Sequence, residues 1–421
     1  MKIGFIGLGK LGLPVALAIE SKKHQIYGYD IDNNVIESIR EKKIPYKEKG
    51  IQKLLNKTKI NILPIKKILE KSELIFIAIQ TPHEKKYEGI TKIPNSRKDF
   101  NYTYIVNLIK KLSLEANKLK IKKNIVIIST VLPGTIRKKI IPIKSKYINI
   151  CYNPFFIAMG NTINDFLKPE FILLGGNNKE ANKKVIKFYK TINTSKVFST
   201  TLENAELIKV SYNTFISTKI SFINTIMEAC HKLPNTNVDQ VSSALKMASK
   251  RLISKAYLNG GMGDGGGCHP RDNIALSHLS EKLNLSFNWF DNIMMQREKQ
   301  TEWLASLIVK NKKKMKVNIL GKSFKDETNL ITGSPSILLK NILLEKKINV
   351  QHWDPYVDFN FKKYEIKYSW KKNPQLYFIG TKHKIFKKFP FCKGSVVIDP
   401  WRIIEKNENI KLISVGIGPS L

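Results

Sequence analysis

The chain has 421 residues, which at roughly 100–200 residues per domain suggests two to four domains, and its hydrophobic fraction of 42% is enough for each domain to bury a core. No apolar run reaches the roughly 18 residues that a membrane-spanning helix needs, and the N-terminal MKIGFIGLGK is typical of a strand that enters a glycine turn, not of a signal peptide. Four cysteines without a CxxC pair argue against a disulfide framework or a metal site and favour a reducing, cytoplasmic compartment.

The formal net charge of +38 raises the possibility of a nucleic-acid partner, but its composition argues against one. Only 7 of the 72 basic residues are arginine, the residue that reads bases and phosphates with a planar fork. Lysines spread along the whole chain are typical of solvated faces. We therefore expect no nucleic-acid partner, although a positive field would attract anionic substrates such as nucleotides.

The first elements in the chain predict a dinucleotide site. An apolar strand over residues 2–6 leads into a G-x-G-x-x-G spacing and an apolar-faced helix. Gly7 allows the tight turn, Gly9 lets a pyrophosphate approach the backbone, and Gly12 lets the helix pack on the strand. The helix start, where Leu11 is also expected to contact the cofactor, offers free N–H groups to the phosphates.

A second strand ends at Asp30, in the position where such folds carry an acidic residue. The carboxylate would bind the adenosine ribose hydroxyls, and its charge would repel a 2′-phosphate, which favours NAD over NADP. The alternative is a glycine turn in some other α/β protein.

Two further strands are expected to deliver hydroxyl groups to the same edge of the sheet. The continuous apolar character of residues 73–82 indicates a buried parallel strand that ends at Thr81 and Pro82. Residues 124–135 repeat the pattern and bring Thr130 to that edge. Turn and helix capping is the alternative role for such hydroxyls.

The middle of the chain predicts a long helix over residues 203–233, which contain neither proline nor glycine. Lys209 and Asn213 are four residues apart, so they lie on one face of this helix. They are either functional or simply solvated. Residues 236–258 also have a helical pattern.

The stretch GGMGDGGGCHPRDN, residues 260–273, places a single cysteine among glycines. A structural cysteine belongs in a packed core, whereas Cys268 is expected on a loop just before a helix, where the thiolate and hence nucleophilic attack are favoured. Arg271 and Lys209 could supply positive charge, and Asp272 could orient a group or exchange a proton. His269 is a poor candidate base, because adjacent side chains rarely aim at one atom.

A dinucleotide site together with a nucleophilic cysteine predicts a dehydrogenase with a covalent thio-intermediate. An alcohol oxidised by NAD gives an aldehyde, which cannot give up a second hydride until a nucleophile has added to it. Attack by the thiolate gives a thiohemiacetal, a second oxidation gives a thioester, and water releases an acid.

The last third predicts a second, smaller doubly wound sheet. Residues 316–324 read as a strand that ends in a glycine turn, and Pro335 suits the first turn of the following helix. A further strand ends in Asp354, and another covers residues 395–402. Without a full G-x-G-x-x-G, this sheet is expected to bind another phosphorylated ligand and not a second NAD.

The order of these motifs resembles the nucleotide-sugar 6-dehydrogenases, the UDP-glucose and GDP-mannose dehydrogenase group. The likeness covers nearly the whole chain and includes GFIGLGKLGLPVA, QTP, STVLPGT, AELIKVSYNTFISTKISFIN, GGGCHPRD, ILGKSFK and WDP. It implies an NAD-binding Rossmann domain over residues 1–198, a central helical region over residues 199–305 that forms a homodimer, and a Rossmann-like α/β domain over residues 306–421 that holds a nucleotide sugar.

The resemblance also implies roles for single residues. Cys268 matches the family's nucleophile, and Lys209 and Asn213 match the pair that binds the oxyanions of the tetrahedral states. Asp272 matches an aspartate that assists proton handling, and Thr130 matches a threonine that positions the hydrolytic water. The expected substrate-binding residues are Lys209, Asn213, Gly265, Gly266, Arg271, Lys325 and Arg402, although a salt bridge is an equal alternative for Arg402.

The chain departs from the family pattern at several positions. Where the family has N-P-E-F-L-x-E-G, Phe155 and Met159 replace two glutamates, one of which is the usual base for thioester hydrolysis. Arg271 stands in place of a lysine, and Thr332 in place of a substrate-contacting arginine. An apolar patch made by Phe155 and Met159 would suit a less polar sugar, such as a deoxy or N-acetylated one.

The leading hypothesis is therefore NAD-dependent oxidation of the C6 alcohol of a nucleotide-diphosphate sugar to a uronic acid for surface polysaccharide. One alternative is oxidation of an unusual sugar that stops at the aldehyde or thioester. Another is a nucleotide-binding protein without catalysis, although such a protein needs neither Cys268 nor Asp272. The sequence leaves open the base, the sugar and the group that activates water.

The remaining cysteines and two tryptophans are expected to pack in cores. Cys151, Cys230 and Cys392 lie in apolar strand or helix contexts, and Trp353 and Trp401 should pack on the C-terminal sheet.

Overall fold

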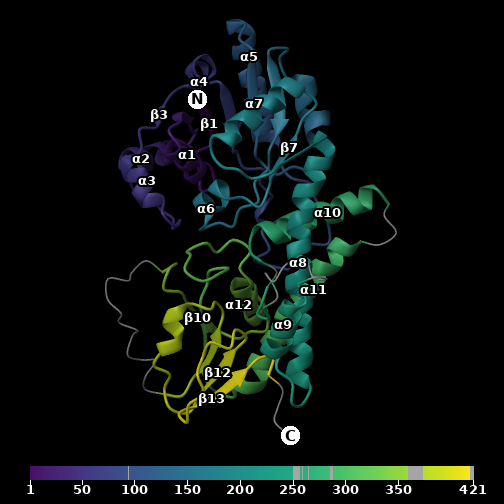
Figure 1. Ribbon diagram of the computed structural model, residues 1–421. Helices are drawn as coiled ribbons and strands as arrows, with labels where there is room; N and C mark the ends of the chain where they lie inside the picture. The colour runs from purple at the N-terminus through teal and green to yellow at the C-terminus, as the bar shows by residue number, and fades with distance from the viewer. Residues whose placement is uncertain are drawn as a thin grey trace. The chain divides into compact units, whose positions relative to one another are not determined.

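The computed structural model describes residues 1–92, 94–249, 257, 259–263, 265–284, 288–358 and 373–417. The chain forms two compact units (Figure 1). The first comprises residues 1–82 and 100–211, and the second comprises residues 83–99 and 212–421. Each unit contains one sheet, as expected for an α/β protein with an N-terminal and a C-terminal doubly wound domain.

The first unit contains an eight-stranded sheet with the order β3-β2-β1-β4-β5-β6-β7-β8. All neighbouring strands are parallel except β6 and β7. The strands are β1 (Lys2–Ile6), β2 (Gln25–Tyr29), β3 (Asn61–Ile62), β4 (Leu74–Ile77), β5 (Lys123–Ile127), β6 (Ile148–Tyr152), β7 (Ile172–Gly175) and β8 (Val197–Thr200). The chain reverses direction across the sheet between β1 and β4, which is the point where doubly wound sheets bind ligands.

Helices connect the strands of the first unit. They are α1 (Gly12–Ser21), α2 (Asn33–Arg40), α3 (Ile51–Lys57), α4 (Ile65–Lys71), α5 (Thr103–Leu119), η2 (Ile136–Ile140), η3 (Ile141–Ile143), α6 (Thr162–Leu167) and α7 (Lys179–Lys190). The segment η2 is a single π-helical turn that follows the loop after β5.

The second unit contains a five-stranded, fully parallel sheet with the order β10-β9-β11-β12-β13. Its strands are β9 (Val317–Leu320), β10 (Val350–Trp353), β11 (Leu376–Ile379), β12 (Ser395–Asp399) and β13 (Ile410–Ser414). Its helices are η1 (Lys85–Tyr87), α9 (Val238–Met247), α10 (Cys268–Lys282), α11 (Trp289–Lys312), α12 (Pro335–Glu345) and η5 (Lys384–Lys388).

The expected long helix is α8 (Leu202–Lys232), which begins in the first unit and continues into the second (Figure 1). Its 31 residues confirm the prediction that a stretch without glycine or proline forms one helix. The expected helix over residues 236–258 is shorter, since α9 ends at Met247. Residues 250–256 and 258 lie outside the described part of the chain.

The two sheets begin with the same turn. In the first unit the Gly7 amide donates to the Tyr29 carbonyl, and the turn after β1 has a positive φ of 92° at Gly7. In the second unit the Gly321 amide donates to the Trp353 carbonyl, and φ at Gly321 is 103°. Glycine is needed at both positions because a side chain would be strained there.

Residues 83–99 leave the first sheet after β4 and pack within the second unit, which the sequence did not predict. Tyr87 is 1% exposed and packs with Ile274 and Met294. The fully buried Arg297 donates to the Gly89 carbonyl. The two ends of this segment are joined in the first unit, where the amide of residue 101 donates to the carbonyl of residue 82.

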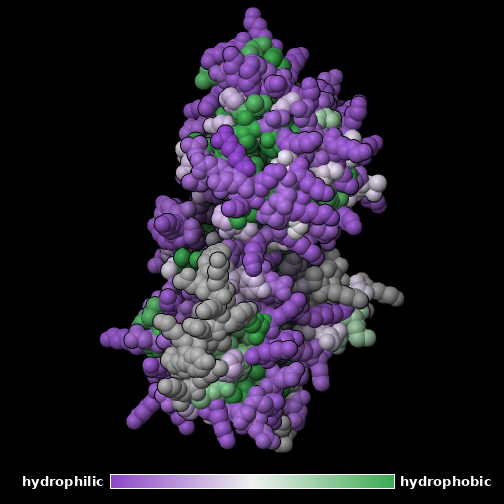
Figure 2. Space-filling model, turned by 90° about the vertical axis from the view of Figure 1, so that its left-hand side faces the viewer, coloured by the Kyte–Doolittle hydropathy of each residue, from purple (hydrophilic) through white to green (hydrophobic). Residues whose placement is uncertain are grey.

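The surface fits the charged composition of the chain. On the face in Figure 2, hydrophilic side chains dominate and hydrophobic ones occur in small separate patches. Among the described residues, every helix is too short or too polar to cross a membrane.

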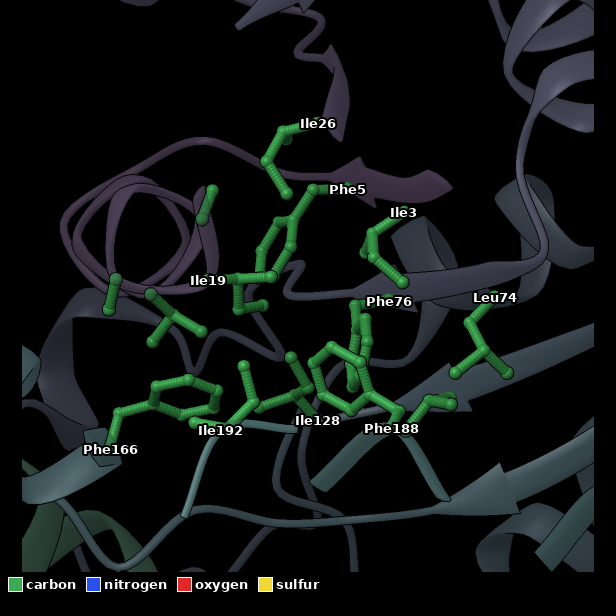
Figure 3. Close-up of a cluster of buried hydrophobic side chains, with 14 of the residues drawn as sticks. Ile3, Phe5, Ile19, Ile26, Leu74, Phe76, Ile128, Phe166, Phe188 and Ile192 are labelled. Atoms are coloured by element: carbon green, nitrogen blue, oxygen red, sulfur yellow. The ribbon is translucent and has the colours of Figure 1, made fainter. Parts of the chain in front are cut away.

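The core of the first unit lies between the sheet and its helices (Figure 3). The rings of Phe5 and Phe76 have centroids 5.8 Å apart, and those of Phe76 and Phe188 are 5.2 Å apart. The side chains of β4 are all fully buried, which explains why this strand is apolar at every position and does not alternate.

Candidate active site

The glycine turn after β1 has the space that a dinucleotide requires. A Cβ atom at Gly12 would lie 1.9 Å from the Gly7 carbonyl oxygen, so helix and turn pack too closely for any side chain there. A Cβ atom at Gly9 would meet nothing within 4 Å. Helix α1 starts after Leu11 without a side-chain cap, and the Leu13 amide already donates to the Gly9 carbonyl at 3.0 Å. The open space at Gly9 and the positive end of the helix dipole fit a pyrophosphate.

Asp30 follows β2 at the same edge of the sheet and holds the glycine turn. One carboxylate oxygen accepts the Leu8 amide at 2.6 Å, and the other accepts the Asp32 amide at 3.0 Å. The neighbouring Ile31 is 88% exposed and was missed by the sequence reasoning. A large apolar side chain exposed to solvent next to the carboxylate that is predicted to bind ribose is suited to contact an adenine ring.

Thr81 and Thr130 come together beyond the ends of β4 and β5. The Thr81 hydroxyl donates to the Thr130 carbonyl at 2.8 Å, and Thr81 is only 2% exposed. The Ser129 hydroxyl donates to the Ile79 carbonyl, which adds a second link between the same two loops. Thr81 therefore fixes the backbone at Thr130, whose own side chain is half-buried.

Lys209 lies on α8 and is 8% exposed. Its ammonium nitrogen lies 5.3 Å from the centroid of the Phe156 ring, close enough for a cation–π interaction. The side chain is therefore not simply solvated, and its functional role stays a prediction.

The Phe155 ring packs inside the first unit. Its centroid is 5.4 Å from that of Phe166, and it belongs to the rim of the main core. Together with Phe166 and Tyr189 it lines a small pocket. Packing in the core is therefore a sufficient reason for an apolar residue at position 155. Phe155 no longer supports the hypothesis of an apolar patch that binds a less polar sugar.

Cys268 is exposed and is the first residue of α10, which corrects the expectation of a loop position. The preceding Gly267 gives the helix no side-chain cap. The thiol therefore lies at the positive end of a helix dipole, which favours negative charge, although the His269 amide already donates to the Gly266 carbonyl at 3.3 Å. Of the three cysteines predicted to pack in cores, Cys151 and Cys230 are buried, whereas Cys392 is half-buried in a loop before β12.

The glycines before Cys268 are required by packing within the second unit. Gly265 and Gly266 have positive φ values of 110° and 101°. A Cβ atom at Gly266 would lie 2.3 Å from the Phe324 ring, and one at Gly267 would lie 2.9 Å from the Thr332 carbonyl oxygen. The cysteine loop is thus held against the loop after β9.

Asp272 is fully buried one helical turn after Cys268 and organises two predicted site residues. Asn213 donates its side-chain amide to one carboxylate oxygen of Asp272. The guanidinium of Arg271 donates to the other oxygen at 3.2 Å. All three side chains were predicted from the sequence, and within the second unit the structure brings them together.

His269 is occupied elsewhere, in agreement with the low expectation for it as a base. Its Nδ1 atom lies 2.9 Å from the Ser217 hydroxyl, and Asn273 donates to the same hydroxyl oxygen at 3.2 Å. This buried polar network joins α8 to α10.

His83 is a half-buried residue near this network that the sequence reasoning did not single out. Burial and the neighbouring positive charge of Arg271 lower the pKa of His83 to about 4. The imidazole is therefore neutral at pH 7. The only sequence signal was its position directly after the Thr81–Pro82 pair.

In the second unit, a cluster of buried polar side chains lies in the loops that follow β9, β10 and β11, near Lys325, which is predicted to bind substrate. His383 Nε2 lies 3.1 Å from both the Asp354 carboxylate and the Ser323 hydroxyl, and all three side chains are at most 1% exposed. Burial alone would raise the pKa of Asp354, but hydrogen bonds from His383 and backbone amides hold it well below its usual range. The cluster fixes the loop that carries Lys325.

Arg402 is fully engaged inside the second unit. It pairs with Asp239 at 2.7 Å and donates to the carbonyls of Gly260, Val415 and Pro400. Of the two roles that the sequence left open, this geometry favours the salt bridge over substrate contact.

Comparisons with known proteins identify the family of this chain. The model of the NAD-binding domain of the UDP-glucose/GDP-mannose dehydrogenase family matches residues 1–193, and the model of its central domain matches residues 203–297. The UDP-glucose 6-dehydrogenase of Rickettsia felis is 30% identical over 376 residues, which cover 86% of this chain and 80% of that protein.

Solved structures show the same fold. A UDP-glucose dehydrogenase from Pyrobaculum islandicum has a TM-score of 0.84 at 20% identity. The two structures match over 99% of this chain and 98% of that chain. A UDP-D-ManNAc dehydrogenase from Pyrococcus horikoshii has a TM-score of 0.81 at 21% identity, with 99% of each chain covered. The predicted cofactor, NAD, is confirmed by the matched NAD-binding domain. The chain belongs to the UDP-glucose/GDP-mannose dehydrogenase family.

Proposed function

We propose that this protein oxidises the C6 alcohol of a nucleotide-diphosphate sugar to the uronic acid through a covalent intermediate on Cys268. The observation that carries the proposal is the exposed thiol at the uncapped start of α10, one turn from the buried pair of Asp272 and Asn213. A binding protein without catalysis has no use for this arrangement.

When bound, NAD accepts a hydride in each of two oxidations. The first converts the alcohol to an aldehyde and releases a proton. The Cys268 sulfur then adds to the aldehyde carbon, forming a C–S bond, and the carbonyl oxygen becomes the oxyanion and then the hydroxyl of a thiohemiacetal. The second oxidation removes the hydride from that carbon and the proton from its hydroxyl group, which leaves a thioester. Water attacks the thioester, the C–S bond breaks, and the thiolate leaves with the acid as product.

The remaining predicted residues are proposed to support these steps. Lys209 and Asn213 would stabilise the oxyanion that develops twice along the reaction. Asp272, which holds the Asn213 amide, would keep that donor oriented and exchange protons. On the nucleotide side, Gly265, Gly266, Arg271 and Lys325 remain proposed substrate contacts, and Gly7, Gly9, Leu11, Gly12, Asp30, Thr81, Pro82 and Thr130 remain proposed cofactor contacts.

A second outcome is favoured by one specific feature. Phe155 and Met159 occupy positions where the family carries glutamates, so no carboxylate is available there to activate water. A reaction that stalls as the thioester, or that releases the aldehyde, is therefore the alternative to full oxidation.

The yield of NADH per sugar decides between these outcomes. Purified protein is offered UDP-glucose, UDP-N-acetylglucosamine, UDP-N-acetylmannosamine and GDP-mannose separately with excess NAD. Two NADH per sugar supports full oxidation to the acid. One NADH per sugar supports release of the aldehyde, and a burst of at most two NADH per protein chain supports a stalled thioester, which intact mass would show as an adduct on Cys268. No NADH with any of these sugars would contradict the proposal for this substrate set.

We also propose that α8 forms a homodimer contact. Leu207, Phe215 and Phe222 are 44%, 47% and 50% exposed, and their spacing of eight and seven residues puts them on one side of the helix. Such a row of large apolar side chains is suited to packing against a second copy. The three-domain division and a cytoplasmic location likewise remain predictions.

A further inference from the structure

Glu206 is a fully buried carboxylate on α8, three residues before Lys209, that the proposed chemistry does not use. Its two oxygens accept hydrogen bonds from two backbone amides of the loop after β5. The Gly134 amide donates to one oxygen at 2.5 Å, and the Ile136 amide donates to the other at 2.9 Å. All of these residues belong to the first unit.

Ile136 is the first residue of the π-helical turn η2, where backbone donors have no partner within the helix, and Gly134 lies two residues before it. No side chain at the preceding Thr135 caps this turn. The carboxylate of Glu206 therefore caps this turn by accepting its amide hydrogen bonds, although Glu206 belongs to another helix, α8. A link of this kind fixes the loop relative to α8 in addition to satisfying its donors.

The same loop is held from other sides. The Tyr102 hydroxyl accepts the Leu132 amide at 3.2 Å and the Thr135 hydroxyl at 3.3 Å. Thr81 holds the carbonyl of Thr130, at the other end of the loop. Glu206 is the link in this set that comes from α8, so it connects the backbone near Thr130 with the helix that carries Lys209.

Burial opposes ionisation of the Glu206 carboxyl group, whereas the hydrogen bonds from the two amides favour it. Burial raises the pKa of Glu206 to about 7, with a smaller contribution from the negative charge of Glu203. The amides of Ile136 and Gly134 and the charge of Arg137 act in the opposite direction. The ionised carboxylate offers two good acceptors, whereas the protonated acid offers one.

We propose that Glu206 is a positioning residue that clamps the loop after β5 onto α8 and thereby sets the relative placement of Thr130 and Lys209. The inference rests on the proposed function, in which these two residues act on the hydrolytic water and on the oxyanion. Glu206 itself touches neither substrate nor cofactor.

The test compares Glu206→Gln with Glu203→Gln as the matched control. Glutamine keeps the shape of Glu206 but presents an NH2 group to one of the two amide donors. Glu203 pairs with Arg137 and so also joins α8 to η2, but this pair is exposed. Each variant replaces one carboxyl group by an amide on neighbouring turns of the same helix.

In steady-state kinetics we expect Glu206→Gln to lower kcat about tenfold while the KM for the sugar changes less than about threefold, because misplaced groups act in the transition state. The wild type and Glu203→Gln should lose kcat as pH falls through about 7, where Glu206 protonates. Glu206→Gln should lack this limb of the pH profile. Equal kcat values and equal profiles in the two variants would overturn the proposal.

Amide hydrogen exchange provides a readout that is independent of turnover. We expect faster exchange in residues 130–140 of Glu206→Gln and unchanged exchange in the same residues of Glu203→Gln. Faster exchange throughout the first unit would mean general destabilisation and would overturn the proposal. If the wild type oxidises none of the sugars, the proposed function fails, and exchange in residues 130–140 still decides whether the clamp exists.

Discussion

At the scale of single residues, several candidate site residues could be predicted from the sequence, because their chemistry depends on residue type and on short spacings along the chain. Asn213, Arg271 and Asp272 were chosen from the sequence, and the structure joins them through one buried carboxylate. Glu206 and His83 were missed, since their importance lies in burial and in partners far along the chain. A glutamate flanked by apolar residues in AELIKV was the available signal for Glu206.

Replacement of the proposed nucleophile tests the covalent route. We expect Cys268→Ser to lower the rate at which the second NADH per sugar forms at least about a thousandfold, because the second oxidation needs the thiohemiacetal and the hydroxyl is a much weaker nucleophile than the thiolate at neutral pH. Cys392→Ser, at a half-buried cysteine of the second unit, is the control and should keep the wild-type rate. Two NADH per sugar from Cys268→Ser at an undiminished rate would exclude a thioester on Cys268.

The buried cluster at the C-terminal sheet gives a prediction about pH. The folded state holds the pKa of Asp354 below its unfolded value of 3.8, so this carboxylate contributes stability above pH 3.8 that is lost as pH falls below it. We expect Asp354→Asn to destabilise the second unit by about 3 kcal/mol at pH 7 and to flatten its loss of stability in acid.

Denaturant unfolding at pH 7 and pH 3, followed by a probe in the second unit, measures both effects. Glu327→Gln is the control, because Glu327 pairs with Lys384 at an exposed site, where ion pairs contribute little to stability. A loss of stability in Asp354→Asn no larger than in this control would show that the cluster does not hold the loop.

At the scale of secondary-structure elements, periodicity and glycine spacing located most strands and helices. The strands β1, β2 and β9 and the helices α8 and α12 lie where the sequence placed them. The expected strand over residues 73–82 is only four residues long, because its pairing with both neighbouring strands ends at Ile77, although Ala78 and Ile79 continue the apolar run. A sequence pattern shows which residues are apolar but does not show where pairing with a neighbour stops.

The cysteine loop is an element whose glycines can be tested. We expect Gly266→Ala to lower kcat at least about tenfold, because a methyl group there would collide with the Phe324 ring and displace Cys268. Gly50→Ala is the matched control for backbone strain, since Gly50 has a positive φ of 79° but open space around it. The measurements are kcat and the thermal midpoint, and equal kcat in both variants would show that contact with Phe324 does not position the nucleophile.

At the scale of the whole molecule, the sequence suggested a boundary near residue 198, whereas the compact units divide within α8. Residues 83–99 belong to the second unit although they interrupt the first in sequence. Their buried contacts with Arg297, Ile274 and Met294 join residues about 200 positions apart. Local pattern contains no information about such pairs, so this part of the organisation was not predictable.

The proposed homodimer can be tested at the same scale. We expect the wild type to have twice the 48.2 kDa chain mass in light scattering. Phe215→Glu should shift the mass towards the monomer, because a charge would be buried without a partner at the contact. Leu114→Glu, at an exposed leucine on α5, controls for the added charge and should leave the mass unchanged. An unaltered mass in Phe215→Glu would place the contact elsewhere.

The sequence by itself determined the class of fold and the cofactor, because glycine turns and buried strands have local physical causes, and the order of its motifs indicated the family by resemblance. The tertiary structure decided which polar groups share hydrogen bonds. It gave Phe155 a place in the core, engaged Arg402 in a salt bridge and placed Glu206 between two amides. These outcomes depend on burial and on contacts between distant segments, and the free energy of a polar side chain is set by those surroundings.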